Sequence, residues 1–102
     1  NFLDNAWEYN AGVSEERMGL ALADGYRQKA FLMTKVCARD RAGALVQLED
    51  SLRRLRTDVI DLWMFHECNQ PGDPNLVFRE AGALEAALEA RRQGKVRFIG
   101  FT

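Results

Sequence analysis

Four short apolar segments, separated by stretches with helical periodicity, constrain the fold of this chain most strongly. They lie at residues 1–4, 31–36, 58–66 and 97–102. The segment 58–66 is apolar at nearly every position, which is typical of a parallel strand covered on both faces. Strands that alternate with helices pair in parallel through right-handed crossovers. The sequence therefore predicts an α/β fold of order βαβαβαβ, belonging either to a doubly wound sheet or to a (β/α)8 barrel.

The segment after the first strand carries the signals of a short helix. Ser14 is a suitable N-cap, and Glu15 and Glu16 follow it in the first turn, where negative charge suits the helix dipole. The pair Asp24-Gly25 predicts the end of this helix, because glycine readily adopts the left-handed conformation of a C-terminal cap.

Two further helices are expected between the later strands. Residues 45–55 place leucines at steps of three and four, which predicts an amphipathic helix. Two i,i+4 ion pairs are expected on its exposed side, Glu49–Arg53 and Asp50–Arg54. Residues 71–74, Pro-Gly-Asp-Pro, predict a loop, and the third helix should lie around residues 84–88 and end at Gly94.

The composition indicates a single folding unit and excludes several classes of function. A chain of 102 residues has room for one core, so residues 1–102 are predicted to form one domain. Fourteen basic residues scattered among fifteen acidic ones leave no positive stripe for nucleic acid. No run of eighteen apolar residues or signal peptide is present, so no membrane contact and a cytoplasmic location are expected.

The two cysteines and the two ends of the chain add further expectations. Cys37 and Cys68 lack the clustered spacing of a metal site, so no metal is predicted and reduced thiols are expected. The chain begins without Met, and both ends have strand character. We therefore expect a piece of a longer protein, truncated at both ends, whose exposed strand edges favour self-association.

Three ionisable residues each end a predicted strand. Asp4, Lys35 and His66 are spaced by 35 − 4 = 31 and 66 − 35 = 31 residues, or one strand–helix unit per step. In both parallel architectures substrates bind at the carboxyl ends of the strands. Tyr9, five residues after Asp4, can fold back over the same edge. The sequence thus predicts a site with a carboxylate, a phenol, an ammonium and an imidazole.

This combination suits proton transfer to a substrate. A phenol is a poor acid at neutral pH unless a cation lies within about 4–6 Å of it, and Lys35 is placed to supply that cation. Asp4 would keep Lys35 charged and oriented, and His66 could hydrogen-bond Tyr9 and the carbonyl of a substrate. Tyr9 is therefore the expected proton donor.

Several segments resemble the aldo-keto reductase family in the order in which they occur there. They are residues 4–9 with D-x-A-x-x-Y, the helix start at 14–19, 34–36 with T-K-V, 60–66 with I-D-L-x-x-x-H and 94–100 with G-K-V-R-x-I-G. The resemblance spans nearly the whole chain. It departs after His66, where many members continue with Trp-Pro and this chain has Glu67-Cys68-Asn69.

The resemblance implies a segment of a (β/α)8 TIM barrel, a half-barrel with the second to fifth strands. It implies an NADPH-dependent oxidoreductase that reduces aldehydes or ketones, with Tyr9 as proton donor and Asp4, Lys35 and His66 in support. Asp4 would border the nicotinamide, and Thr102 would contact its carboxamide. The family's phosphate-binding residues lie in the seventh and eighth units, so residues 1–102 alone are expected to have little or no activity.

Two alternative functions remain open at this stage. Lys35 could attack a carbonyl itself, as in a Schiff-base aldolase. The protein could also be a non-catalytic relative that senses a nucleotide or binds a partner. The substrate is not indicated, because specificity depends on loops that mostly lie outside these residues.

Overall fold

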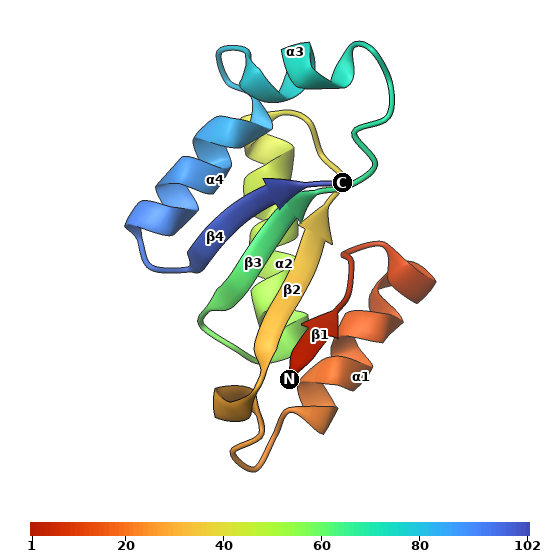
Figure 1. Ribbon diagram of the computed structural model, residues 1–102, viewed down its shortest axis with the longest axis vertical. Coiled ribbons are helices and arrows are strands. Elements are labelled where there is room, and N and C mark those ends of the chain that lie inside the picture. Colours follow the sequence, from red (N-terminus) through yellow and green to blue (C-terminus); the bar gives the residue numbers. More distant parts are fainter.

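The computed structural model describes all residues from 1 to 102. Its four strands form one parallel sheet in the order β1-β2-β3-β4 (Figure 1). Their bounds are β1 (Phe2–Asp4), β2 (Phe31–Val36), β3 (Ile60–Phe65) and β4 (Val96–Phe101). Each strand therefore lies beside the one that follows it in the sequence, which confirms the predicted βαβαβαβ order.

Three helices connect the strands and lie against one face of the sheet (Figure 1): α1 (Val13–Ala21), α2 (Arg41–Leu55) and α4 (Ala83–Arg92). Helix α2 packs between α1 and α4. In a doubly wound sheet the strand order reverses and helices cover both faces, whereas a barrel wall keeps sequential strands inside one ring of helices. The arrangement is that of a barrel wall. None of the helices is long and apolar enough to cross a membrane.

The hydrophobic core lies between the helices and the sheet. Helix α2 contributes Leu48, Leu52 and Leu55, which are at most 8% exposed, as its leucine periodicity predicts. The β3 residues Ile60 and Trp63 pack in the same cluster. Each such side chain contributes about 1.5–3 kcal/mol by leaving water. The packing of these side chains in one layer between the helices and the sheet holds the strands, and therefore their carboxyl ends, in place.

The opposite face of the sheet carries exposed aromatic side chains. Phe31 stacks on Phe2 and Phe98, with ring centroids 5.2 and 6.2 Å apart. Phe2 and Phe98 are 59% and 51% exposed. These rings belong to three strands and form a continuous apolar surface, which is the face that would turn inward if the sheet closed into a barrel.

The predicted N-cap of α1 is wrong. The helix begins at Val13, Gly12 occupies the N-cap position, and no side chain caps the helix. Gly12 has φ +89°, and a Cβ there would meet the Arg54 guanidinium, so the chain turns into the helix at Gly12, two residues before Ser14. The helix also ends early, at Ala21, and Asp24-Gly25 belongs to the turn after it, with φ of 59° and 86°.

The predicted loop at residues 71–74 contains the start of an additional helix, α3 (Asp73–Phe78). Pro74 lies in the first turn, where proline is tolerated because the backbone N–H there has no helical partner. Pro-Gly-Asp-Pro thus marks a helix start as well as a turn.

One of the two ion pairs expected on α2 is confirmed. Asp50 and Arg54 approach to 4.0 Å, and Asp50 also pairs with Arg53 at 3.0 Å. Glu49 instead pairs with Lys95, just before β4. The expected Glu49–Arg53 pair is therefore wrong, because a basic residue from another element reaches Glu49.

Candidate active site

Lys35 is the central residue at the carboxyl edge of the sheet. Its side chain is buried, and the residue is only 4% exposed. The ammonium pairs with Asp4, donates to the carbonyl of Asn5 at 2.8 Å and lies 3.4 Å from the Tyr9 hydroxyl. An ammonium has three donors, so each has a partner. The structure thus brings Asp4, Tyr9 and Lys35 together as predicted.

The strand register explains how the equally spaced residues are arranged. Asp4 is paired with Met33, so Lys35 lies two residues further along β2 and on the same face. Lys35 in turn is paired with Met64, so His66 lies two residues beyond it along the next strand. Asp4, Lys35 and His66 therefore lie on a diagonal across three neighbouring strands. Lys35 reaches Asp4 directly, whereas His66 is not among the partners of the ammonium.

Tyr9 is held over the sheet edge by the loop after β1, which contains the short 3-10 helix η1 (Tyr9–Gly12). The N–H of Trp7 donates to the carbonyl of Lys35 at 3.0 Å. The Trp7 indole donates to Asp50 at 3.3 Å and lies under the Arg54 guanidinium at 5.3 Å. This loop is therefore tied to both β2 and α2, and it leaves Tyr9 39% exposed.

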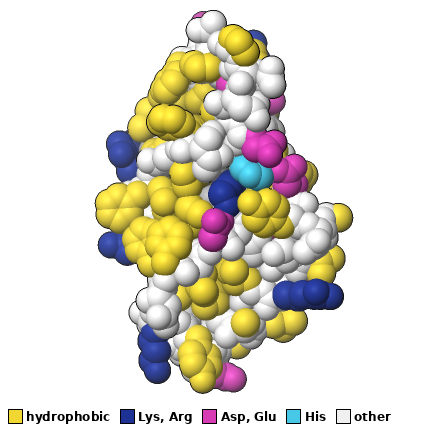
Figure 2. Space-filling view, turned by 45° about the vertical axis from the view of Figure 1, so that its right-hand side comes forward, with side chains coloured by type: hydrophobic (Ala, Val, Ile, Leu, Met, Phe, Trp, Pro, Cys, Tyr) yellow, Lys and Arg dark blue, Asp and Glu magenta, His cyan; other side chains and the backbone are white.

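The sequence suggested a hydrogen bond between His66 and Tyr9, but the structure shows none. The two rings meet edge to face, with centroids 5.6 Å apart and planes at 75°. The imidazole Nδ1 is instead 2.7 Å from a carboxylate oxygen of Glu8. Figure 2 shows this single histidine at the surface among acidic and basic side chains. The sequence alone does not single out Glu8 as a partner of His66, although Glu8 directly precedes Tyr9.

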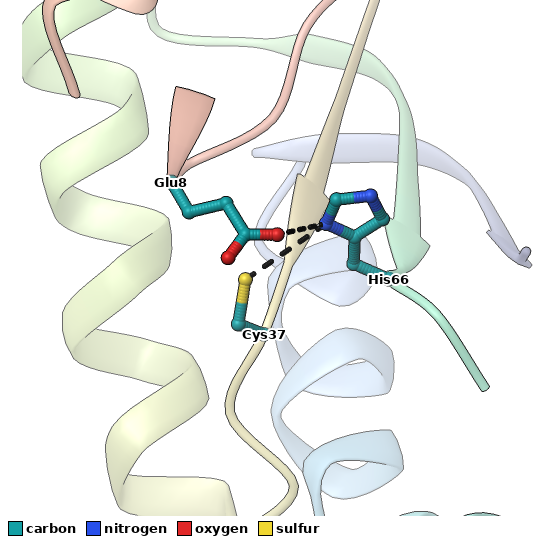
Figure 3. Close-up of side chains that lie close together, drawn as sticks. All are labelled: Glu8, Cys37 and His66. Atoms are coloured by element: carbon teal, nitrogen blue, oxygen red, sulfur yellow. Dashed lines mark hydrogen bonds and ion pairs between the residues drawn. The ribbon is translucent and has the colours of Figure 1, made fainter. Parts of the chain in front are cut away.

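Cys37 is a second neighbour of His66 that the sequence did not single out for this role. Its Sγ lies 4.0 Å from Nδ1, on the same side of the ring as Glu8 (Figure 3). Burial, with the nearby Glu8 carboxylate, raises the pKa of the Cys37 thiol to about 11. Both cysteines are free, so no disulfide is present in this structure.

Arg39 connects the ends of β2 and β3. Its guanidinium donates to the carbonyls of Cys37 at 3.0 Å and His66 at 2.6 Å, and it pairs with Asp73 at 3.0 Å. The backbone N–H of Gln70, together with Arg39, holds the pKa of Asp73 below its usual range. One partly buried ion pair thus anchors both strand ends to the start of α3.

Thr102 lies directly after β4 at the same edge. Its N–H donates to the carbonyl of Phe65 at 2.9 Å, and its hydroxyl accepts from the N–H of Glu67 at 3.0 Å. Since Phe65 is paired with Phe101, Thr102 is level with His66. The exposed Thr102 hydroxyl still has its own hydrogen to donate.

The sequence model of the Aldo/keto reductase family matches residues 1–102, the whole of this chain. The chain belongs to this family. It is 38% identical over 100 residues to "Methylglyoxal reductase YeaE" of Escherichia coli and 34% identical over 109 residues to "Aldo-keto reductase YhdN" of Bacillus subtilis. Both alignments cover 96% of this chain but only 32% and 31% of the relatives. The chain therefore spans about a third of their length.

Solved aldo-keto reductase structures have the same fold over this region. AKR11C1 of Bacillus halodurans, in its holo form, superposes with a TM-score of 0.79 at 34% identity, covering 100% of this chain and 36% of that protein. An aldo-keto reductase of Klebsiella pneumoniae in complex with NADPH gives 0.83 at 30% identity, covering 99% and 34%. This agreement confirms that the four-stranded unit is a segment of the family's TIM barrel.

Proposed function

We propose that the full-length protein reduces aldehydes or ketones by hydride transfer from NADPH, with Tyr9 as the proton donor. The observation that carries this proposal is the 3.4 Å approach of the buried Lys35 ammonium to the Tyr9 hydroxyl. A cation at this distance stabilises the phenolate that remains after the proton has left. The exposure of Tyr9 leaves its hydroxyl accessible to a substrate.

Asp4 and His66, the other two residues of the predicted site, support this proton transfer. Asp4 compensates the charge of Lys35, so the ammonium is held in one orientation within the partly buried site. Glu8 and Cys37 both face Nδ1 of His66, and the Nε2 atom points away from them (Figure 3). Nε2 is therefore the atom that we assign to the substrate carbonyl oxygen.

Asp4 and Thr102 fit the nicotinamide end of the cofactor. The Asp4 carboxylate is 55% exposed, and the hydroxyl of Thr102 has a hydrogen available for a carboxamide oxygen. Bound NADPH supplies the hydride. The Klebsiella pneumoniae relative, solved with NADPH, supports this choice of cofactor.

The Schiff-base alternative fits the environment of Lys35 less well. A nucleophilic lysine must be a neutral amine, and amines of this kind are usually desolvated or placed next to another cation. Lys35 instead pairs with the Asp4 carboxylate and has partners for all three donors. A lysine nitrogen held by three partners is not free to attack a carbonyl, which suits a supporting role for Lys35.

The experiment that tests this function is an NADPH oxidation assay on the full-length protein with a panel of aldehydes and ketones. Methylglyoxal is a natural first substrate, because one relative is a methylglyoxal reductase. The proposal predicts saturable turnover, with no substrate trapped on Lys35 by borohydride. NADPH binding without turnover of any carbonyl would favour the non-catalytic alternative, and trapping on Lys35 would favour the aldolase.

We also propose that residues 1–102, prepared alone, self-associate. Strands β1 and β4 each have one unpaired edge, and the aromatic face between them carries Phe2 and Phe98. Such edges and apolar faces pair with other chains when nothing covers them. Light scattering should show oligomers that grow with concentration, whereas a monodisperse monomer would contradict the proposal.

A further inference from the structure

Three potential metal ligands of different chemistry converge at the sheet edge. They are the Glu8 carboxylate, the Cys37 thiol and the His66 Nδ1 atom, whose ligand atoms all lie within 4.8 Å of one another (Figure 3). Each follows a different strand, β1, β2 or β3. We propose that these three side chains bind one divalent transition-metal ion of the zinc type, an inference that does not depend on the proposed reductase activity.

The spacing of the three ligand atoms is close to that of a tetrahedral site. Zinc bonds of about 2.0–2.1 Å to nitrogen or oxygen and about 2.3 Å to sulfur place neighbouring ligand atoms roughly 3.3–3.5 Å apart. The distances from Nδ1 are 2.7 Å to the Glu8 oxygen and 4.0 Å to the Cys37 sulfur. The third distance, from the Glu8 oxygen to the Cys37 sulfur, is at most 4.8 Å, so shifts of roughly half to one ångström in the side chains would complete the geometry.

Two of the three ligands stand on a fixed scaffold. The N–H of Cys37 donates to the Gln47 side chain at 2.8 Å, and the N–H of His66 donates to the carbonyl of Val36 at 2.9 Å. Arg39 bonds the carbonyl oxygens of both ligand residues. The Glu8 side chain is 47% exposed and so has room to adjust. The backbones of Cys37 and His66 can therefore stay in place on metal binding while their side chains adjust slightly, and the exposed Glu8 side chain can move furthest.

The surrounding charge and space suit a cation. The three residues line a cavity of about 220 Å³ that also has Glu67, Asp73 and Arg39 in its wall. The charges of Arg39 and Asp73 compensate each other, since the two side chains pair at 3.0 Å. The carboxylates of Glu8 and Glu67 therefore leave the cavity negative. The space admits a water as fourth ligand, which is typical of open zinc sites.

The mixture of ligand atoms selects the kind of metal. Calcium and magnesium prefer sites made of oxygen atoms, whereas imidazole and thiolate favour zinc and its neighbours. Without a metal, the Glu8 carboxylate lies against His66 Nδ1 at 2.7 Å and the Cys37 thiol lies beside them. These two states of the site differ in whether the Cys37 sulfur bonds to a metal, and this difference can be observed directly.

The test is a titration of the full-length protein, stripped of metals, with Co²⁺ and then with Zn²⁺ in competition with a chromophoric chelator. We expect one Co²⁺ per chain to produce a thiolate-to-cobalt absorption band, and Zn²⁺ to displace it. Cys37→Ser should abolish the band and weaken Zn²⁺ binding by about tenfold or more, and Glu8→Gln should keep the band but weaken binding by about tenfold.

Cys68→Ser is the matched control, because the Cys68 thiol donates to the carbonyl of Phe65 at 3.7 Å and is not one of the three ligands. This variant should retain both the band and the affinity. Circular dichroism verifies the fold of each variant, and Glu8→Gln decides the question if Cys37→Ser does not fold. Absence of saturable binding, a band that survives Cys37→Ser, or unchanged affinity in Glu8→Gln would overturn the proposal.

Discussion

The Lys35 ammonium lies 3.4 Å from the Tyr9 hydroxyl and 5.0 Å from the centre of the Tyr9 ring, while it pairs with Asp4 on its other side. The positive charge at this point is the feature that makes a phenol useful as a proton donor. Burial of an ammonium without partners would be strongly unfavourable in the protein interior. The Asp4 carboxylate and the Asn5 carbonyl compensate this cost.

Replacement of this ammonium should therefore remove most of the reductase activity. In the full-length protein Lys35→Met keeps the volume but removes the charge, and we expect kcat to fall by about 10²–10⁴-fold. Lys29→Met is a suitable control, because Lys29 is exposed and lies over the Tyr26 ring, outside the site. Comparable kcat values for the two variants in steady-state assays would contradict the role given to Lys35.

A second prediction concerns Asp61, which is buried at the start of β3. Its carboxylate pairs with Arg27 at 2.9 Å and Arg97 at 2.7 Å and accepts from the N–H of Leu32 at 2.9 Å. Asp61→Asn leaves both guanidinium groups without their anion, so it should lower the free energy of unfolding by about 2 kcal/mol at pH 7. Urea denaturation of the two proteins measures this difference.

The effect of Asp61 should also depend on pH. Burial alone would raise the pKa of Asp61, but the Leu32 N–H and the two arginines outweigh it and hold the pKa below its usual value. Stabilisation by a carboxylate of this kind is complete above the unfolded pKa of about 3.9 and is lost as the pH falls through the lower folded value. The gap between wild type and Asp61→Asn should thus persist to about pH 5 and close in stronger acid. The exposed Asp58→Asn should show no such gap.

A third prediction tests the contact between α1 and α2. A Cβ on Gly19 would lie 2.2 Å from the carbonyl oxygen of Arg54, which belongs to the backbone and cannot move aside alone. Gly19→Ala should therefore destabilise the protein by about 1–3 kcal/mol, despite the higher helix propensity of alanine. Gly72→Ala is the control, because no atom lies within 4 Å of its added Cβ. Equal melting temperatures for both variants would refute this packing argument.

Much of this architecture follows from local patterns in the sequence. The strands, the leucine face of α2 and the strand-end positions of Asp4 and Lys35 were predictable, because they depend on periodicity and on chain direction. The start of α1 was not, because the lack of space beside Gly12 depends on Arg54, about forty residues away. Likewise, Glu49 pairs with Lys95 from another element, which helix spacing cannot indicate.

The candidate site shows the same limit. The equal spacing of Asp4, Lys35 and His66 predicts a shared edge, but it contains no information about the strand register that sets them diagonally. The Glu8–His66 pair and the nearby Cys37 thiol arise from this diagonal placement and from the path of the loop after β1. Such contacts between successive strand ends have no short-range sequence signature, so the sequence indicated no metal site.

The most direct test of the central claim is the kcat for carbonyl reduction by the full-length protein with Tyr9→Phe. This change removes only the hydroxyl that faces Lys35, so we predict that kcat falls by about 10²–10⁴-fold while the affinity for NADPH stays within about twofold. Tyr26→Phe, at an exposed tyrosine outside the site, should retain full activity. A Tyr9→Phe protein as active as Tyr26→Phe would contradict the assignment of Tyr9 as the proton donor.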